Sequence, residues 1–130
     1  MTDTPVRRIM TSPVVTIRPD ASLTDAARTM QDAEIGSVIV VDDDNSPEGI
    51  LTRTDFVELA AAEESAADTD VRSVMETDVV DVPADESLET AVEAMTDHGV
   101  HHLPIVTDAG EIVGVVTTTD LAETSYDGPS

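Results

Sequence analysis

The sequence predicts a mixed α/β (α+β) fold, in which two similar β-α-β-β-α units pack sheet to sheet with approximate two-fold symmetry. The first observation is an internal repeat: residues 6–55 align with residues 71–120 at a constant offset of 65 positions, with no gap and 17 identities in 50 pairs. The second is that each copy alternates short β-branched runs with a helical stripe of apolar residues. The third is size, because a unit of about 50 residues buries too little surface to fold well alone.

Both copies contain the same elements in the same order. In the first copy we expect a turn or helix at 6–10, strands at 14–17, 37–41 and 48–51, and helices beginning at 22 and spanning 54–62. In the second copy we expect a turn or helix at 71–75, strands at 79–82, 103–106 and 111–116, and helices at 87–98 and 118–123. Residues 63–70 read as a linker, and the tail at 124–130 has no pattern.

The first long helix shows how an element is assigned. Ser22 is a good N-cap, and Asp25 three residues later completes a capping-box pattern. The apolar stripe that follows, at i, i+3, i+4 and i+7, consists of Leu23, Ala26, Ala27 and Met30. Gly36 is expected to end this helix. The strand after it is continuously apolar, so we expect both of its faces to be buried.

Acidity is the extreme feature of the composition. The chain has 28 acidic and 6 basic residues, a formal net charge of −22. Such a chain repels duplex nucleic acid and anionic membranes, which excludes both as partners. The carboxylates are interleaved with regular apolar patterns, which favours a folded protein of a halophilic archaeon over a disordered chain. Because the Debye length is roughly 3 Å in ~1 M salt, we expect folding to depend on salt.

Several features that the sequence lacks narrow the class of protein further. No apolar run approaches the ~20 residues of a membrane span, and the first residues do not resemble a signal peptide. The chain has no cysteine, which excludes disulfides, thiolate zinc sites and cysteine nucleophiles. No serine-hydrolase or phosphate-loop motif is present. We therefore expect a cytoplasmic protein that is not an enzyme.

A Gly-x-x-Thr-x-x-Asp motif closes both copies, at 49–55 and 114–120. In each copy a strand runs into the first turn of a helix, so a hydroxyl and a carboxylate lie beside unpaired backbone N–H groups. Thr-x-x-Asp is a helix-capping pattern. The same groups are also suited to hold a ribose and a phosphate. The residues alone leave both interpretations open.

Together these motifs resemble the CBS domain pair, or Bateman module. The resemblance covers residues 6–123 and rests on the runs at 19–23, 36–42, 71–75 and 101–106 and on both motif ends. It implies tandem CBS repeats at 6–62 and 71–123 that form one module with two clefts between them. The unpaired apolar helices of the packed repeats favour a homodimer. The chain resembles the stand-alone type that is related to IMP dehydrogenase, without the barrel that carries that enzyme's chemistry.

In this family the module is regulatory. Its clefts commonly bind adenosine-containing ligands such as AMP, ATP or S-adenosylmethionine, and the bound ligand changes the behaviour of a partner. The resemblance thus implies a sensor that signals to a separate protein. Two alternatives stay open, namely a constitutive dimerisation or scaffold module with empty clefts, and a non-catalytic subunit of an enzyme encoded elsewhere.

The resemblance also implies which residues contact the ligand. The family uses the aspartate of the closing motif for the two ribose hydroxyls and the threonine near the phosphate or ribose. Thr16 matches a polar contact near the base, whereas its counterpart Asp81 departs from the pattern, so the two sites should differ. The implied nucleotide-binding residues are Thr16, Ile17, Gly36, Ser37, Thr52, Arg53, Asp55, Asp81, Val82, His101, His102, Pro104, Thr117, Thr119 and Asp120.

Other clusters have simpler interpretations. His101 and His102 are adjacent, and neighbours on a strand point to opposite faces, so we expect no metal there. The run at 42–45 lacks the glycine and glutamate of a calcium loop, which indicates a solvated turn. Arg18 and Arg28 should balance nearby carboxylates.

Overall fold

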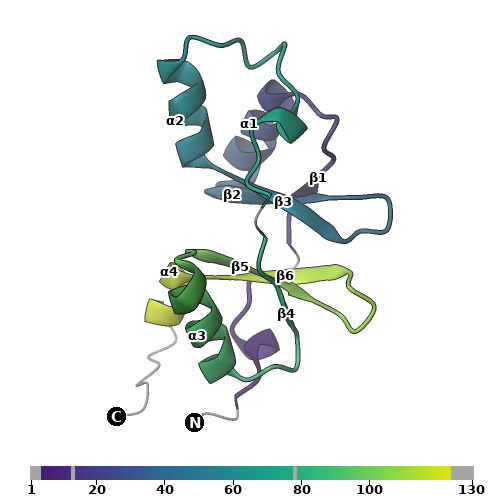
Figure 1. Cartoon of the computed structure of the whole chain (residues 1–130), viewed down its shortest axis with the longest axis vertical. Helices are drawn as coiled ribbons and strands as arrows, with labels where there is room; N and C mark the ends of the chain where they lie inside the picture. Colours follow the sequence, from purple (N-terminus) through teal and green to yellow (C-terminus); the bar gives the residue numbers. More distant parts are fainter. Residues whose placement is uncertain (1–3, 13, 78, 124–130) are drawn as a thin grey trace. The chain divides into compact units, whose positions relative to one another are not determined.

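The structure is a computed structural model that describes residues 4–12, 14–77 and 79–123 (Figure 1). The tail expected at 124–130 lies outside these residues. The described elements are the 3-10 helices η1 (Val6–Arg8) and η2 (Val71–Ser73), the strands β1 (Thr16–Ile17), β2 (Ser37–Val41), β3 (Pro47–Thr52), β4 (Val82–Pro83), β5 (His102–Val106) and β6 (Ile112–Thr117), and the helices α1 (Leu23–Ala33), α2 (Arg53–Ala61), α3 (Leu88–His98) and α4 (Thr118–Glu123). The predicted mixed α/β class and the repeated order of elements are confirmed.

The chain forms two compact units that have exchanged their opening segments. The central unit is Val15–Val79, and the terminal unit combines Met1–Val14 with Val80–Ser130; both are named for their place in the sequence. As a result η1, which opens the first sequence repeat, belongs to the unit built by the second repeat. In the same way η2 opens the second repeat but belongs to the central unit.

The central unit is a three-stranded sheet with its helices on one face. β2 lies in the middle, parallel to β1 and antiparallel to β3. Figure 1 shows α1 and α2 on the same side of this sheet. The buried core between helices and sheet consists of Leu23, Ala26, Met30, Val38, Val40, Leu51, Leu59 and Val71. Because Val71 is fully buried in this core, η2 completes the packing of the unit.

The terminal unit repeats this plan. β5 lies between the parallel strand β4 and the antiparallel strand β6, and α3 and α4 lie on one side of the sheet (Figure 1). Its core consists of Val6, Val82, Ala91, Met95, Leu103, Ile105 and Val116. Val6 has no exposed surface, so η1 contributes to this core as η2 does to the other. The register is also repeated, since His102 pairs with Thr117 as Ser37 pairs with Thr52.

The structure differs from the predictions at the end of α1 and in the lengths of β1 and β4. The predicted end of the first helix at Gly36 is wrong: α1 ends at Ala33, and Glu34 adopts the left-handed conformation with φ 55°. Gly99 occupies the equivalent place after α3 with φ 64°, where a glycine has no steric penalty. The strands expected at 14–17 and 79–82 are shorter, because β1 and β4 each pair with the middle strand over only two residues.

Two glycines let the exchanged segments approach the sheets closely. A Cβ built on Gly49 would lie 2.6 Å from Met75 Sδ and 2.9 Å from the Glu76 backbone oxygen. A Cβ on Gly114 would lie 2.8 Å from Met10 Cγ. A Cβ at Gly49 would press on the backbone of the neighbouring segment, whereas a Cβ at Gly114 would first displace the Met10 side chain. The glycine that opens each Gly-x-x-Thr-x-x-Asp motif therefore fixes the neighbouring segment, a role that the sequence reading did not assign.

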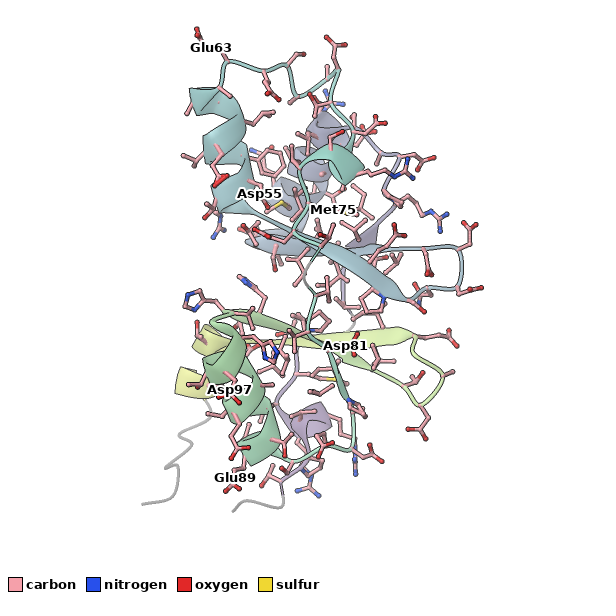
Figure 2. The ribbon with its side chains drawn as sticks, viewed as in Figure 1. Asp55, Glu63, Met75, Asp81, Glu89 and Asp97 are labelled. Atoms are coloured by element: carbon pink, nitrogen blue, oxygen red, sulfur yellow. The ribbon has the colours of Figure 1, made fainter. Side chains whose placement is uncertain are left out.

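Charged groups lie on the surface of the described part of the chain, where no polar or charged side chain is buried. Figure 2 shows Glu63 and Glu89 pointing away from their units. Arg18 forms an ion pair with Asp43 and donates to the backbone oxygen of Asp42 at 2.9 Å. Arg18 also donates a hydrogen bond to the Asp43 carboxylate, and this bond raises the pKa of Arg18. Arg18 thus balances carboxylates as expected, and the run at 42–45 forms a turn.

Candidate functional site

The motif of the central unit forms a carboxylate corner where β3 meets α2. Figure 2 shows Asp55 at this end of α2. Its Oδ2 accepts a hydrogen bond from the Thr52 backbone N–H at 2.8 Å, and the Thr52 hydroxyl lies 3.5 Å from the same oxygen. Asp55 therefore caps the helix, which is one of the two roles that the sequence left open. Among the described residues, no hydrogen bond to Asp55 Oδ1 accompanies these contacts.

Gly36, Ser37 and Arg53 lie beside this corner. Ser37 pairs with Thr52 across β2 and β3, and the Arg53 backbone N–H donates to the Gly36 oxygen at 3.3 Å. The Arg53 guanidinium rests on Gly36, because a Cβ at that position would lie 2.7 Å from Arg53 Nη1. A permanent cation therefore occupies the space that a side chain at position 36 would take.

The terminal unit has an equivalent corner where β6 meets α4. Asp120 Oδ2 accepts from the Thr117 N–H at 2.9 Å, and the Asp120 N–H donates to Thr117 Oγ1 at 3.1 Å, which completes a reciprocal capping box. The Thr118 N–H donates to the His101 oxygen at 3.2 Å, and His102 pairs with Thr117 in the sheet. The structure thus brings His101, His102, Thr117 and Asp120 together.

Thr11 is a residue of this corner that the sequence reading missed. Its hydroxyl donates to Asp120 Oδ1 at 3.3 Å, and its oxygen lies 3.5 Å from Oδ2. Thr11 comes from the exchanged opening segment, which the Thr11–Val115 bridge attaches to β6. The available signal was weak, because position 11 aligns with Glu76 in the repeat and the motif itself does not include it.

The electrostatics of the terminal corner centre on His102. Burial lowers the pKa of His102, repulsion from His101 lowers it further, and Asp120 opposes both effects. His102 is therefore neutral at pH 7 and offers a hydrogen-bonding ring rather than a positive charge. Beside the central corner, by contrast, the charged group is the Arg53 guanidinium, which rests on Gly36.

The remaining predicted site residues lie further along the sheets. Thr16 and Ile17 pair with Ile39 and Val40 on β1 and β2. Asp81 is exposed just before β4, where Val82 pairs with Ile105 (Figure 2). Pro104 pairs with Val115, and Thr119 lies on α4 with its side chain outside the described part of the structure. The ligand contacts implied for all of these residues stay predictions.

Two hollows flank α2 in the central unit. One is a groove of about 550 Å³ between α1 and α2, lined by Ala27, Met30, Gln31, Glu34, Ile35, Arg53 and Phe56. The other, of about 220 Å³, is lined by Asp55, Glu58, Leu59, Ala62, Glu64 and Val74. Arg53 lines the first of these two hollows and Asp55 lines the second.

The corners can do more than cap helices. Each carboxylate has about four lone-pair positions, and the described hydrogen bonds use only some of them. A carboxylate that accepts two hydroxyl hydrogen bonds suits a vicinal diol such as that of ribose. The described residues contain no group of three metal-ligating side chains. In the described part of the chain no helix has both the length and the apolar character needed to cross a membrane.

Comparison with known proteins identifies the repeats. A family model for the CBS domain matches residues 6–62 and residues 71–127. A 17.7 kDa protein of Acidianus ambivalens is 34% identical over 124 residues, which cover 95% of this chain and 74% of that protein. The inosine-5'-monophosphate dehydrogenase of Halobacterium salinarum is 33% identical over 110 residues, which cover 85% of this chain and 21% of the enzyme. The expected similarity to part of that enzyme is confirmed.

A solved structure shows the same fold. The CBS domain pair of protein MJ0100, in complex with 5'-methylthioadenosine and S-adenosyl-L-methionine, matches with a TM-score of 0.83 at 24% identity, and the match covers 93% of this chain and 94% of that chain. At this identity the likeness concerns the fold alone.

Proposed function

The chain belongs to the CBS domain family, and from this membership we propose that it is a regulatory module that binds adenosine nucleotides of the AMP, ATP or S-adenosylmethionine class. Asp55 and Asp120 accept hydrogen bonds from the ribose hydroxyls, and the motif threonine of each corner holds the carboxylate in place. The observation that carries the proposal is the repeated corner, in which a carboxylate fixed by a backbone N–H keeps acceptor positions for a ligand. The adenosine ligands of MJ0100, a protein of the same fold, support the choice of ligand class.

The proposed output is a change in a separate partner protein. A ligand shifts an equilibrium only if it binds one conformation more tightly than another. We infer that the module works as a homodimer, that ligand stabilises one of its conformations, and that it catalyses no reaction itself. The net charge of −22 repels nucleic acid and anionic membranes, so the proposed partner is neither of these.

Calorimetry in molar KCl tests the proposal. AMP, ADP, ATP and S-adenosylmethionine are titrated into the parent protein, Asp55→Ala and Asp120→Ala. We expect binding to the parent, and each substitution should weaken one class of site about tenfold or more, because hydrogen bonds to a charged group are lost. Asp55→Asn and Asp120→Asn are matched controls that keep a capping oxygen but remove the charge, so they separate ligand binding from helix capping.

The results also discriminate between the candidate functions. Absence of heat with every ligand would favour a constitutive scaffold, a reading that the use of both carboxylates as helix caps supports. Binding that survives both alanine substitutions would refute the assigned residues and keep the sensor. Loss of binding in the alanine variants, with weakened binding in the asparagine variants, is the outcome that the proposal requires.

A further inference from the structure

We propose that one residue of each exchanged segment, Thr11 in the terminal unit and Glu76 in the central unit, sets which adenosine ligand each carboxylate corner accepts. The inference rests on the proposed function and specifies it. The Asp120 corner accepts a phosphorylated adenosine more readily than the Asp55 corner does, and the Asp55 corner prefers an uncharged or cationic one.

Thr11 and Glu76 occupy equivalent places. They are 65 residues apart, the offset of the repeat. Thr11 exchanges backbone hydrogen bonds with Val115 at 2.8 and 3.2 Å, and Glu76 exchanges them with Ile50 at 2.9 and 3.0 Å. Val115 and Ile50 are themselves equivalent. The side chains at 11 and 76 therefore start from the same point relative to their motif aspartates.

Thr11 positions the Asp120 carboxylate without adding charge. Its hydroxyl donates to Oδ1 while the Thr117 N–H donates to Oδ2, so donors from two separate segments hold the two oxygens. Each oxygen keeps a lone pair for a ligand hydroxyl. A carboxylate that is already oriented loses less conformational freedom on binding, which favours affinity.

Glu76 cannot reproduce this contact, because an ionised carboxylate accepts hydrogen bonds but donates none. It adds a negative charge on the segment facing the Asp55 corner. The hollow that contains Asp55 is lined by two further acids, Glu58 and Glu64, and by no cation. Arg53 lines the groove between α1 and α2 together with Glu34, and it is not among the residues that line the hollow of Asp55. A phosphate is repelled by such surroundings and a sulfonium is attracted.

Reciprocal exchange of the two residues tests the proposal. The Asp55→Ala background isolates the Asp120 corner, and the Asp120→Ala background isolates the Asp55 corner. AMP, adenosine and S-adenosylmethionine are titrated by calorimetry at the lowest KCl concentration at which thermal unfolding shows every variant to be folded, because salt screens the effect of charge. We expect Thr11→Glu to weaken AMP binding at the Asp120 corner about tenfold and adenosine binding less, because a like charge disfavours an anionic ligand. We expect Glu76→Thr to strengthen AMP binding at the Asp55 corner by a similar factor.

Two further variants separate charge from position. Thr11→Val removes the donor without adding charge, so AMP and adenosine should weaken by the same factor of roughly three to ten. Ser12→Glu adds the same charge at the neighbouring exposed position and should change both affinities less than about twofold. An unchanged ratio of AMP to adenosine affinity in Thr11→Glu and Glu76→Thr overturns the inference while leaving the proposed function intact. Failure of all three ligands to bind either background and the parent overturns the proposed function, and this inference with it.

Discussion

The Thr11 hydroxyl donates a hydrogen bond to Asp120 Oδ1 over 3.3 Å, although 109 residues separate the two in the chain. The contact exists because the opening segment of the first repeat packs in the unit built by the second. The same exchange places Val6 in the core of the terminal unit and Val71 in the core of the central unit. Each unit is therefore completed by residues from the other repeat.

Shortening the side chains of these two valines should show which unit each opening segment stabilises. Val6→Ala and Val71→Ala each remove two buried methyl groups and should cost about 2–3 kcal/mol, because transfer and cavity effects add. In hydrogen exchange, Val6→Ala should reduce protection most in β5 and β6, whereas Val71→Ala should reduce it most in β2 and β3. Loss of protection in β2 and β3 on Val6→Ala, with β5 and β6 unaffected, would contradict the exchange.

A second prediction concerns the glycine that opens the motif. Gly49→Ala should destabilise the protein by about 1–3 kcal/mol, because its Cβ would press on Met75 Sδ and on the Glu76 backbone oxygen. Gly36→Ala is the matched control, since the Arg53 guanidinium that it meets is the end of a flexible side chain and can move. Denaturant unfolding measures both. Equal midpoints for Gly49→Ala and the parent protein would show that the close approach is not needed.

Much of this arrangement could be predicted from the sequence, because its signals are local. The repeat, the order of elements, the Ser22 cap and the motif caps follow from spacing within a few residues. The end of α1 could not be read in this way, because Glu34 takes a left-handed conformation that glycine normally occupies. The exchange of segments and the Thr11–Asp120 contact join residues far apart in sequence, and no local pattern encodes such pairs.

The pKa of His102 gives a pH prediction. Burial lowers this pKa below its usual value of about 6.5, so the folded state favours the neutral ring. The unfolded state then binds more protons in the window just below pH 6.5, and stability is complete above that pH and falls as the pH decreases towards the lower folded pKa. His102→Gln should make the melting temperature less sensitive between pH 7.5 and about 5.5, above most carboxylate titrations.

The control for this effect is His98→Gln. His98 is exposed at the end of α3, where its ring nitrogen Nδ1 lies 3.0 Å from the Ala94 oxygen. This variant shows what the loss of an exposed imidazole alone does to the pH profile. If His98→Gln and His102→Gln flatten the profile equally, burial of His102 is not its cause.

The acidic surface predicts a dependence on salt. With a net charge of −22, exposed carboxylates repel one another, and salt screens this repulsion. The melting temperature should rise steadily from low salt to molar KCl. The double variant Glu93→Gln, Asp97→Asn removes two exposed charges from α3 and should be more stable at low salt, with a smaller rise. A melting temperature that is flat across this range would argue against adaptation to high salt.

The most direct test of the account is whether the motif carboxylates grip a ribose. The Thr52 and Thr117 backbone N–H groups donate to Asp55 and Asp120, so their amide NMR signals report on these carboxylates. Adenosine and 2',3'-dideoxyadenosine, which lacks both ribose hydroxyls, are titrated into the labelled protein. The account predicts saturable shifts of at least one of these signals with adenosine and much weaker binding of the dideoxy compound. Equal affinity for the two compounds, or unmoved signals at saturating adenosine, would contradict it.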